Sequence, residues 1–164
     1  MGAVRHLRTR SDLGIDPAKV GVTGSSAGGH LSTWVSNAMP VGEKPAFVIP
    51  LYGLINLYES KSLAAEKALV QLLGPGYNSQ KAINLSTHLM VDENTSPTLL
   101  FLCYDDSLVP STDGVEYYEA LVRHGVKASM HIYPFGGHSI KRHYPEYQAA
   151  VLEWLKYLGL MTNK

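Results

Sequence analysis

The sequence predicts an α/β fold in which about four parallel strands are covered by helices on both faces. Short apolar, β-prone segments alternate along the chain with segments whose apolar residues recur at helical spacing. One strand stops abruptly at Gly24-Ser25-Ser26-Ala27-Gly28 and continues as a helix. This strand–turn–helix pattern places a serine at the carboxyl end of a sheet strand.

Length and composition limit the classes of protein to consider. A chain of 164 residues that is 45% hydrophobic can bury one core, so residues 1–164 are expected to form a single domain. Fourteen basic residues balance fourteen acidic ones, which argues against nucleic acid and membrane surfaces as partners. The single cysteine, Cys103, lies in an apolar segment and is expected to be a small core residue. No signal-peptide core or membrane-length apolar run is found, which leaves the compartment open.

The first third of the chain contains the serine turn. Residues 2–11 resemble the last turns of a helix that begins before the sequence does, and Gly14 and Pro17 end it. A strand over 19–24 leads into the turn. The helix that follows, to Ala38, has an apolar stripe consisting of Leu31, Trp34, Val35 and Ala38.

The remaining elements alternate in the same way. A buried strand over 46–52 is followed by a long insertion, 54–96, which contains a helix over 63–73 and is expected to lie over the carboxyl ends of the strands. Further strands are predicted over 97–104 and 127–133, with a helix over 111–124 between them. A closing helix, which has Pro145 in its first turn and is stopped by Gly159, carries a strong apolar stripe.

The turn around Ser26 has the form of a nucleophile elbow. Gly24 and Gly28 are expected to provide the space that lets strand and helix pack closely. The backbone N–H of Ala27 is the expected oxyanion donor, helped by the positive end of the helix dipole. The bare pentapeptide also fits an ordinary tight turn of small residues, but the flanking strand and helix favour a catalytic serine.

A base and an acid follow at the ends of two later strands. Asp105 and Asp106 come after the third strand, and His138 stands in a glycine-flanked loop after the fourth. Asp106 is preferred as the acid, whereas Asp105 also fits a solvated turn. Of the other histidines, His30 is expected to brace its surroundings, and His131 is expected to be a strand residue. The order Ser26, Asp106, His138 matches a catalytic triad delivered from one edge of the sheet.

These residues carry a resemblance to a known family. The chain resembles the carboxyl-terminal part of an α/β-hydrolase of the acetyl esterase and acetyl-xylan esterase type, a group also labelled lipase/esterase or xylanase. The matching segments are 3–8, 14–20, 24–31, 106–110, 117–121 and 133–138. The resemblance implies Ser26 as nucleophile, Asp106 as acid and His138 as base. It departs from the family at Gly114 and Ser139, and it lacks the family's first strands and their His-Gly-Gly oxyanion loop.

The resemblance and the triad together predict a serine hydrolase that cleaves short acyl esters, acetyl groups on xylan or another carbohydrate among them, through an acyl-enzyme. No cofactor and no metal are expected. A serine peptidase of the prolyl-oligopeptidase kind is the alternative enzyme, although Gly28-Gly29-His30 favours the esterase. A further alternative is a catalytically impaired half-fold that serves as an assembly module, because losing one oxyanion donor costs about 10²–10³ in rate.

The truncated fold also predicts a homodimer. In a complete α/β-hydrolase sheet, the strand from Lys19 to Gly24 has a neighbour on each side. Without the earlier strands, one edge of this strand is exposed, with unpaired backbone groups. A two-fold axis would pair the strand with its symmetry mate in an antiparallel junction. Exchange of the amino-terminal helix between two chains is the alternative that meets the same need.

Overall fold

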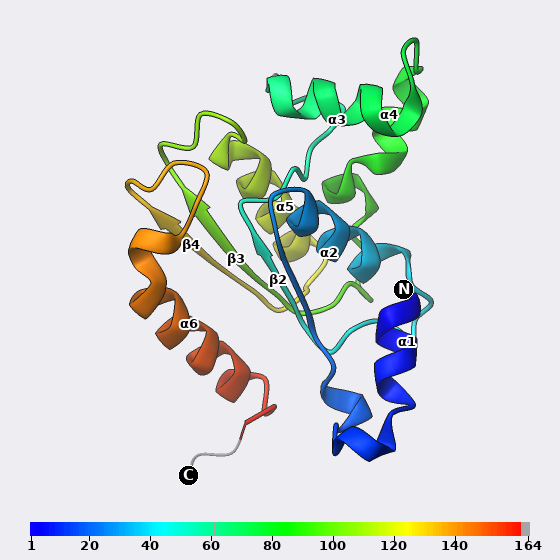
Figure 1. Cartoon of the computed structure of the whole chain (residues 1–164), viewed down its shortest axis with the longest axis vertical. Helices are drawn as coiled ribbons and strands as arrows, with labels where there is room; N and C mark the ends of the chain where they lie inside the picture. Colours follow the sequence, from blue (N-terminus) through cyan, green and yellow to red (C-terminus); the bar gives the residue numbers. More distant parts are fainter. Residues whose placement is uncertain (61, 162–164) are drawn as a thin grey trace.

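The structure, a computed structural model, describes residues 1–60 and 62–161; residue 61 of the predicted insertion and residues 162–164 of the predicted domain lie outside the described residues. It contains a four-stranded parallel sheet in the order β1-β2-β3-β4 (Figure 1). The strands are β1 (Val22–Ser25), β2 (Val48–Leu51), β3 (Thr98–Cys103) and β4 (Ala128–Tyr133). The predicted α/β fold class is therefore confirmed.

The first strand begins later than its apolar pattern predicts. Lys19 belongs to a 3₁₀ helix, η2 (Pro17–Lys19), and not to β1. The carboxylate of Asp16 accepts the Ala18 N–H at 2.9 Å and caps this turn, so the chain becomes extended only afterwards. The expected strand 19–24 is thereby corrected to Val22–Ser25.

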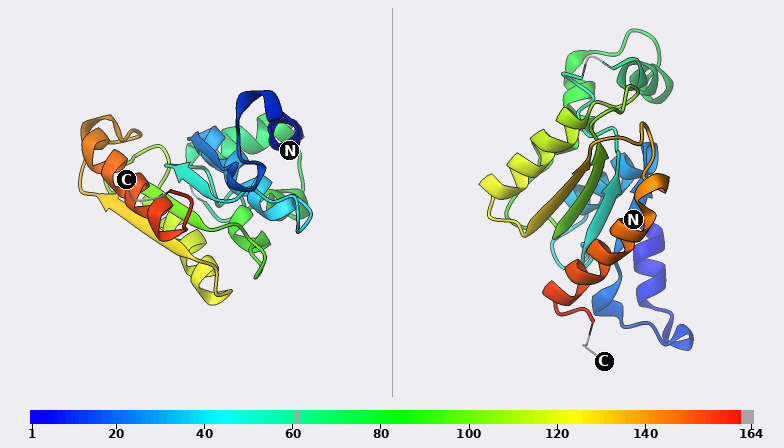
Figure 2. Two further views of the ribbon diagram at one scale, coloured as in Figure 1. Left: turned by 90° about the horizontal axis from the view of Figure 1, so that it is seen from below. Right: turned by 90° about the vertical axis from the view of Figure 1, so that its left-hand side faces the viewer.

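Helices cover both faces of the sheet (Figure 2). One face carries α5 (Ser111–Arg123), and the other carries α6 (Tyr144–Tyr157). Alternate residues of β3 point to the two sides: Leu100 packs in the cluster beneath α5, whereas Leu99 and Phe101 pack beneath α6. Every residue of β3 is buried, as expected for a parallel strand covered twice. No helix within the described ranges is long and apolar enough to cross a membrane.

The helix after the serine turn, α2 (Ala27–Ala38), buries a different face from the apolar one predicted. Leu31 is 61% exposed, whereas Gly29, Thr33 and Ser36 are buried. The reason is a close approach of backbones, because a Cβ on Gly29 would lie 2.7 Å from Gly53 Cα. Only small residues fit there, and the Thr33 hydroxyl is satisfied by donating to the His30 carbonyl at 2.9 Å.

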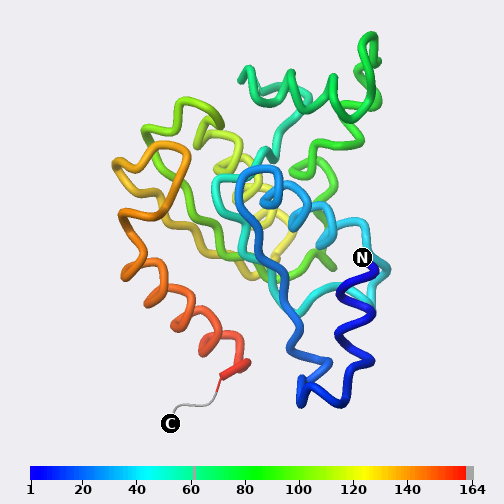
Figure 3. The backbone as a smooth tube through the Cα atoms, viewed as in Figure 1, coloured from blue at the N-terminus to red at the C-terminus, as the bar shows by residue number. Residues whose placement is uncertain are grey.

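After β2 the chain leaves the sheet and forms a helical layer before it returns as β3 (Figure 3). This layer contains α3 (Leu63–Leu73), α4 (Ser79–Leu85) and the 3₁₀ helix η3 (Thr87–Met90). α3 has the predicted bounds and buries Ala65 and Leu69, but Leu72 is 61% exposed. η3 packs against both α2 and α5, which ties the layer to one face of the sheet.

The amino-terminal helix α1 (Gly2–Arg8) lies beside the start of β1 (Figure 1). Val4 is buried with Val20 and Met39, while Leu7 is 37% exposed. Arg8 fixes this corner by donating to the backbone carbonyls of residues 43 and 44, both at 2.7 Å. Among the described residues β1 pairs only with β2, so its other edge faces outward.

Candidate active site

Ser26 occupies a strained turn between β1 and α2. Its φ is 54° and its ψ is −120°, a left-handed conformation that non-glycine residues rarely adopt. The turn is held because the Ser26 N–H donates to the Leu51 carbonyl at 2.9 Å and its carbonyl accepts the His30 N–H at 3.2 Å. Such strain costs about 1–3 kcal/mol and persists only where the surroundings enforce it. The predicted elbow is present in the structure.

Of the two glycines predicted to provide space at this turn, Gly24 does so and Gly28 does not. A Cβ on Gly24 would lie 2.2 Å from the Gly28 carbonyl oxygen, so a side chain at Gly24 is excluded. A Cβ on Gly28 would meet nothing within 4 Å, so the expectation for Gly28 is wrong. The second close approach is at Gly29, which lies against Gly53.

The structure brings together the three side chains predicted from the sequence. His138 Nε2 lies 2.7 Å from Ser26 Oγ, and His138 Nδ1 lies 2.8 Å from Asp106 Oδ2. The Asp106 side chain is 1% exposed, and its other oxygen accepts the N–H groups of Leu108 and Val109 at 2.9 and 3.0 Å. The carboxylate is thus fixed as an acceptor. It orients the Nδ1–H tautomer of His138, whose Nε2 can take a proton from Ser26.

Asp105 has a separate contact, with the backbone of the histidine loop. Its carboxylate accepts the N–H of Gly136 at 3.1 Å and that of Gly137 at 2.7 Å. These two donors lower the pKa of the Asp105 carboxyl below its ordinary value. Both glycines have positive φ, 145° and 61°. Asp105 therefore fixes the backbone of the loop that carries His138. It is neither the carboxylate that contacts His138 nor simply a solvated turn residue.

The site also includes Tyr52, which sequence reasoning did not single out. Its ring meets the His138 ring edge-on, with 4.7 Å between centroids and 69° between planes. Like Ser26, Tyr52 has a positive φ, 38°, and its N–H donates to the Phe101 carbonyl at 2.8 Å. The one sequence signal for Tyr52 is its position at the end of the predicted strand 46–52, because the carboxyl ends of parallel strands meet at the site.

Two further side chains hold the histidine loop. His143 Nε2 lies 2.6 Å from the Phe135 carbonyl, and its ring stacks on Tyr133 with centroids 4.1 Å apart. Cys103 Sγ lies 3.1 Å from the Ser139 carbonyl. Cys103 is 1% exposed and burial raises the pKa of its thiol, which keeps it protonated. Cys103 is the core residue that the sequence predicted.

His30 and His131, which the sequence did not favour as the base, lie outside the triad. His30 Nε2 is 2.8 Å from the Leu85 carbonyl at the end of α4, which is the predicted bracing role. Burial lowers the pKa of His30, so the ring stays neutral. His131, in β4, stacks on Phe101 with centroids 5.2 Å apart.

Ala27, the predicted oxyanion donor, is the first residue of α2. The first N–H groups of a helix have no partner within it and point toward its amino-terminal end, where Ser26 stands. When Ser26 Oγ attacks a carbonyl carbon, the oxyanion that forms on that carbon would lie near this positive end of the helix. Within the described ranges, no group of three or more His, Cys, Asp or Glu side chains could hold a metal ion.

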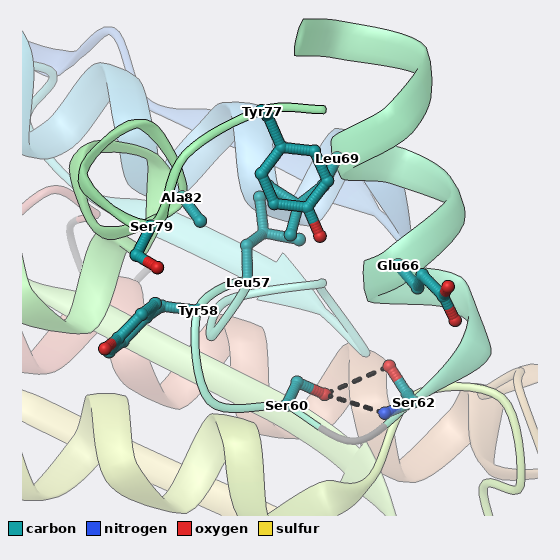
Figure 4. A pocket seen from close by; sticks show the side chains of 9 residues that line it. All are labelled: Leu57, Tyr58, Ser60, Ser62, Glu66, Leu69, Tyr77, Ser79 and Ala82. Atoms are coloured by element: carbon teal, nitrogen blue, oxygen red, sulfur yellow. Dashed lines mark hydrogen bonds between the residues drawn. The ribbon is translucent and has the colours of Figure 1, made fainter. Parts of the chain in front are cut away.

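A polar cavity of about 360 Å³ lies in the helical layer beyond the sheet (Figure 4). Its walls come from the segment after β2, from α3 and from the start of α4, and they consist of Leu57, Tyr58, Ser60, Ser62, Glu66, Leu69, Tyr77, Ser79 and Ala82. No triad residue lines it. The cavity offers hydroxyl groups, one carboxylate and two tyrosine rings to a ligand.

Comparisons with known proteins agree with this fold. The sequence profile of the prolyl oligopeptidase family matches residues 1–160. An acetylxylan esterase of Xylanibacter ruminicola is 38% identical over 128 residues, which is 76% of this chain and 26% of that protein. The chain thus spans about a quarter of this curated relative.

Solved structures extend the likeness to almost the whole chain. An acetyl ester-xyloside bifunctional hydrolase from Caldicellulosiruptor lactoaceticus superposes with a TM-score of 0.89 at 30% identity, covering 98% of this chain and 64% of that one. An esterase from Thermogutta terrifontis superposes with a TM-score of 0.79 at 22% identity, covering 99% of this chain and 64% of that one, a likeness of fold alone. The resemblance to α/β-hydrolases of the acetyl esterase type is confirmed.

Proposed function

The chain belongs to the prolyl oligopeptidase family, and we propose that it acts as a serine esterase on short acyl esters. The observation that carries this proposal is the hydrogen-bonded series from Asp106 through His138 to Ser26 at a strained elbow. An ester of acetic acid, free or on a carbohydrate, is the proposed substrate. The likeness to an acetylxylan esterase supports this choice over a peptide substrate.

The geometry supports a two-step mechanism. Ser26 Oγ attacks the ester carbonyl carbon while its proton passes to His138 Nε2, 2.7 Å away. The Ala27 N–H donates to the resulting oxyanion, and Asp106 stabilises the imidazolium without being protonated. The C–O bond to the alcohol then breaks as His138 returns the proton to the leaving oxygen. Water, deprotonated by the same ring, attacks the acyl-serine and releases the acid.

The chemistry of the cavity in Figure 4 suits a carbohydrate. Serine and tyrosine hydroxyls both donate and accept, and Glu66 accepts, so together they can match the hydroxyl groups of a sugar. Leu57 lines this cavity and also a small apolar pocket that reaches Ala27. Leu57 is thus a wall that the two spaces share, and no triad residue lines the polar cavity.

A homodimer through β1 is the assembly that we favour. Val22 N–H donates to the Phe47 carbonyl at 3.0 Å and Ser26 N–H donates to the Leu51 carbonyl at 2.9 Å, so these groups face β2. In a parallel strand the alternate residues face the other neighbour, which leaves the N–H groups of Thr23 and Ser25 on the open edge. Both residues are exposed. A second β1 in antiparallel orientation satisfies these groups.

The proposed activity is tested with three substrates: p-nitrophenyl acetate, acetylated xylan and a proline-containing peptide amide. The esterase proposal expects release of p-nitrophenol and of acetate from xylan, both lost in Ser26→Ala. Cleavage of the peptide with no release of acetate would identify the peptidase instead. Release of acetate that persists in Ser26→Ala would contradict either enzyme.

A further inference from the structure

A small apolar pocket of about 140 Å³ lies between the start of α2 and the helix α3. It is lined by aliphatic side chains from three segments, together with His30: Ala27, Leu31, Leu54, Leu57, Ala68 and Leu72. We propose that this pocket binds the acyl chain of the ester and limits that chain to about six carbons. This inference rests on the proposed esterase function and specifies which acyl groups the site accepts.

The position of the pocket matches the acyl side of the reaction. Ala27 follows the nucleophile in the chain, lines the pocket, and supplies the expected oxyanion donor. Because Ser26 directly precedes Ala27 in the chain, the pocket lies next to the nucleophile. His138 must protonate the leaving oxygen, so the alcohol part lies on the histidine side. No residue of the loop that carries His138 lines the pocket, which leaves the acyl chain as the part that can enter it.

The chemistry of the walls suits a hydrocarbon. His30 is the only lining residue with a polar side chain, and its Nε2 is already occupied by the Leu85 carbonyl at 2.8 Å. Because burial lowers the pKa of His30, this wall carries no charge. Leu31 and Leu72, which line the pocket, are each 61% exposed overall, although both are large aliphatic residues. A bound acyl chain would remove part of that surface from water, which is favourable.

The size of the pocket sets the length of the chain. An apolar cavity of about 150 Å³ holds a benzene ring of six carbons. The pocket, at about 140 Å³, offers similar room. Each methylene transferred from water into such a site strengthens binding by about fourfold. The value of kcat/KM is therefore expected to rise from acetate to butanoate and hexanoate, and to fall for octanoate and decanoate.

The first test is a series of p-nitrophenyl esters from acetate to decanoate. Ala68→Leu adds three carbons inside the pocket, while the matched control Lys67→Leu places the same side chain on an exposed position of α3. The hexanoate-to-acetate ratio of kcat/KM is expected to fall at least about tenfold in Ala68→Leu and to stay within about twofold in the control. An unchanged ratio in Ala68→Leu, or wild-type preference for decanoate, would overturn the inference.

Leu72→Phe provides a second way to fill the pocket, from an exposed position that does not disturb the core of α3. It is expected to reduce the same ratio. If Ala68→Leu does not fold, as judged by circular dichroism, Leu72→Phe decides the outcome on its own.

The second test measures binding without catalysis. Saturation-transfer NMR of sodium hexanoate with Ser26→Ala is expected to show contact of the methyl and chain protons with the protein. This contact should disappear in Ser26→Ala/Ala68→Leu and remain in Ser26→Ala/Lys67→Leu. Contact without any Ser26-dependent ester hydrolysis in the wild type would refute the proposed function and retain the pocket. Hydrolysis with no such contact would refute the pocket and retain the function.

Discussion

The two neighbouring aspartates should differ strongly when each is changed to asparagine. Asp106 accepts two backbone N–H groups with Oδ1 and faces His138 Nδ1 with Oδ2. In Asp106→Asn the amide oxygen keeps the backbone donors, so its NH₂ group faces Nδ1. The ring must then accept at Nδ1 and hold its proton at Nε2. In that tautomer His138 cannot take the proton of Ser26.

A wrong tautomer in a triad of this kind lowers kcat by about 10⁴, which corresponds to about 5 kcal/mol in the barrier. Asp105→Asn retains an oxygen that can accept one of the two glycine N–H groups, and Asp105 is exposed. Its loss of kcat is therefore expected to be less than about tenfold. The ratio between the two variants is then about 10³.

The assay is kcat for p-nitrophenyl acetate at pH 8, with thermal unfolding as a check that both variants fold. Asp105→Ala, which removes the clamp on Gly136 and Gly137 altogether, should lie between the two asparagine variants. Losses of the same size in Asp105→Asn and Asp106→Asn would refute the tautomer argument. A larger loss at Asp105 would make Asp105 the triad acid.

Three other predictions concern stability and assembly. Gly24→Ala should lower the free energy of unfolding in urea by about 1–3 kcal/mol while Gly28→Ala does not lower it; equal losses would contradict the packing at the elbow. Burial raises the pKa of Asp113 from 3.8 to about 6, so this carboxyl stabilises the fold below about pH 4 and that contribution is lost as the pH rises through 6. Asp113→Asn should therefore gain about 1–2 kcal/mol relative to wild type between pH 4 and pH 7, and a constant difference would refute the shift. Thr23→Pro, which removes an outward N–H, should convert the β1 dimer to a monomer in light scattering, whereas Thr23→Val should not; a monomeric wild type would exclude the dimer.

The order of the site residues could be predicted because parallel strands deliver their carboxyl ends to one edge of the sheet. Ser26 directly follows β1, and Asp106 and His138 lie in the loops after β3 and β4; the structure brings them within hydrogen-bond distance. The choice of Asp106 over Asp105 depends on the direction in which each side chain leaves the turn. Sequence position alone does not give that direction for two adjacent residues.

Other features depend on contacts that a periodic pattern cannot express. The apolar stripe of α2 predicts burial of Leu31, but the close approach of Gly29 to Gly53 turns the small residues inward. The Asp105 clamp and the Tyr52 contact with His138 arise only after distant loops have closed. The positive φ of Tyr52 has no sequence signal, since it occurs at a residue type that rarely adopts it.

We propose that Ser26 is a nucleophile activated by His138. Incubation with a fluorophosphonate followed by peptide mapping in a mass spectrometer tests this directly, because such reagents phosphonylate an activated serine. We expect one phosphonyl group per chain, on Ser26, and a loss of labelling in His138→Ala. No labelling of Ser26 in the folded wild type, or equal labelling in His138→Ala, would contradict the claim.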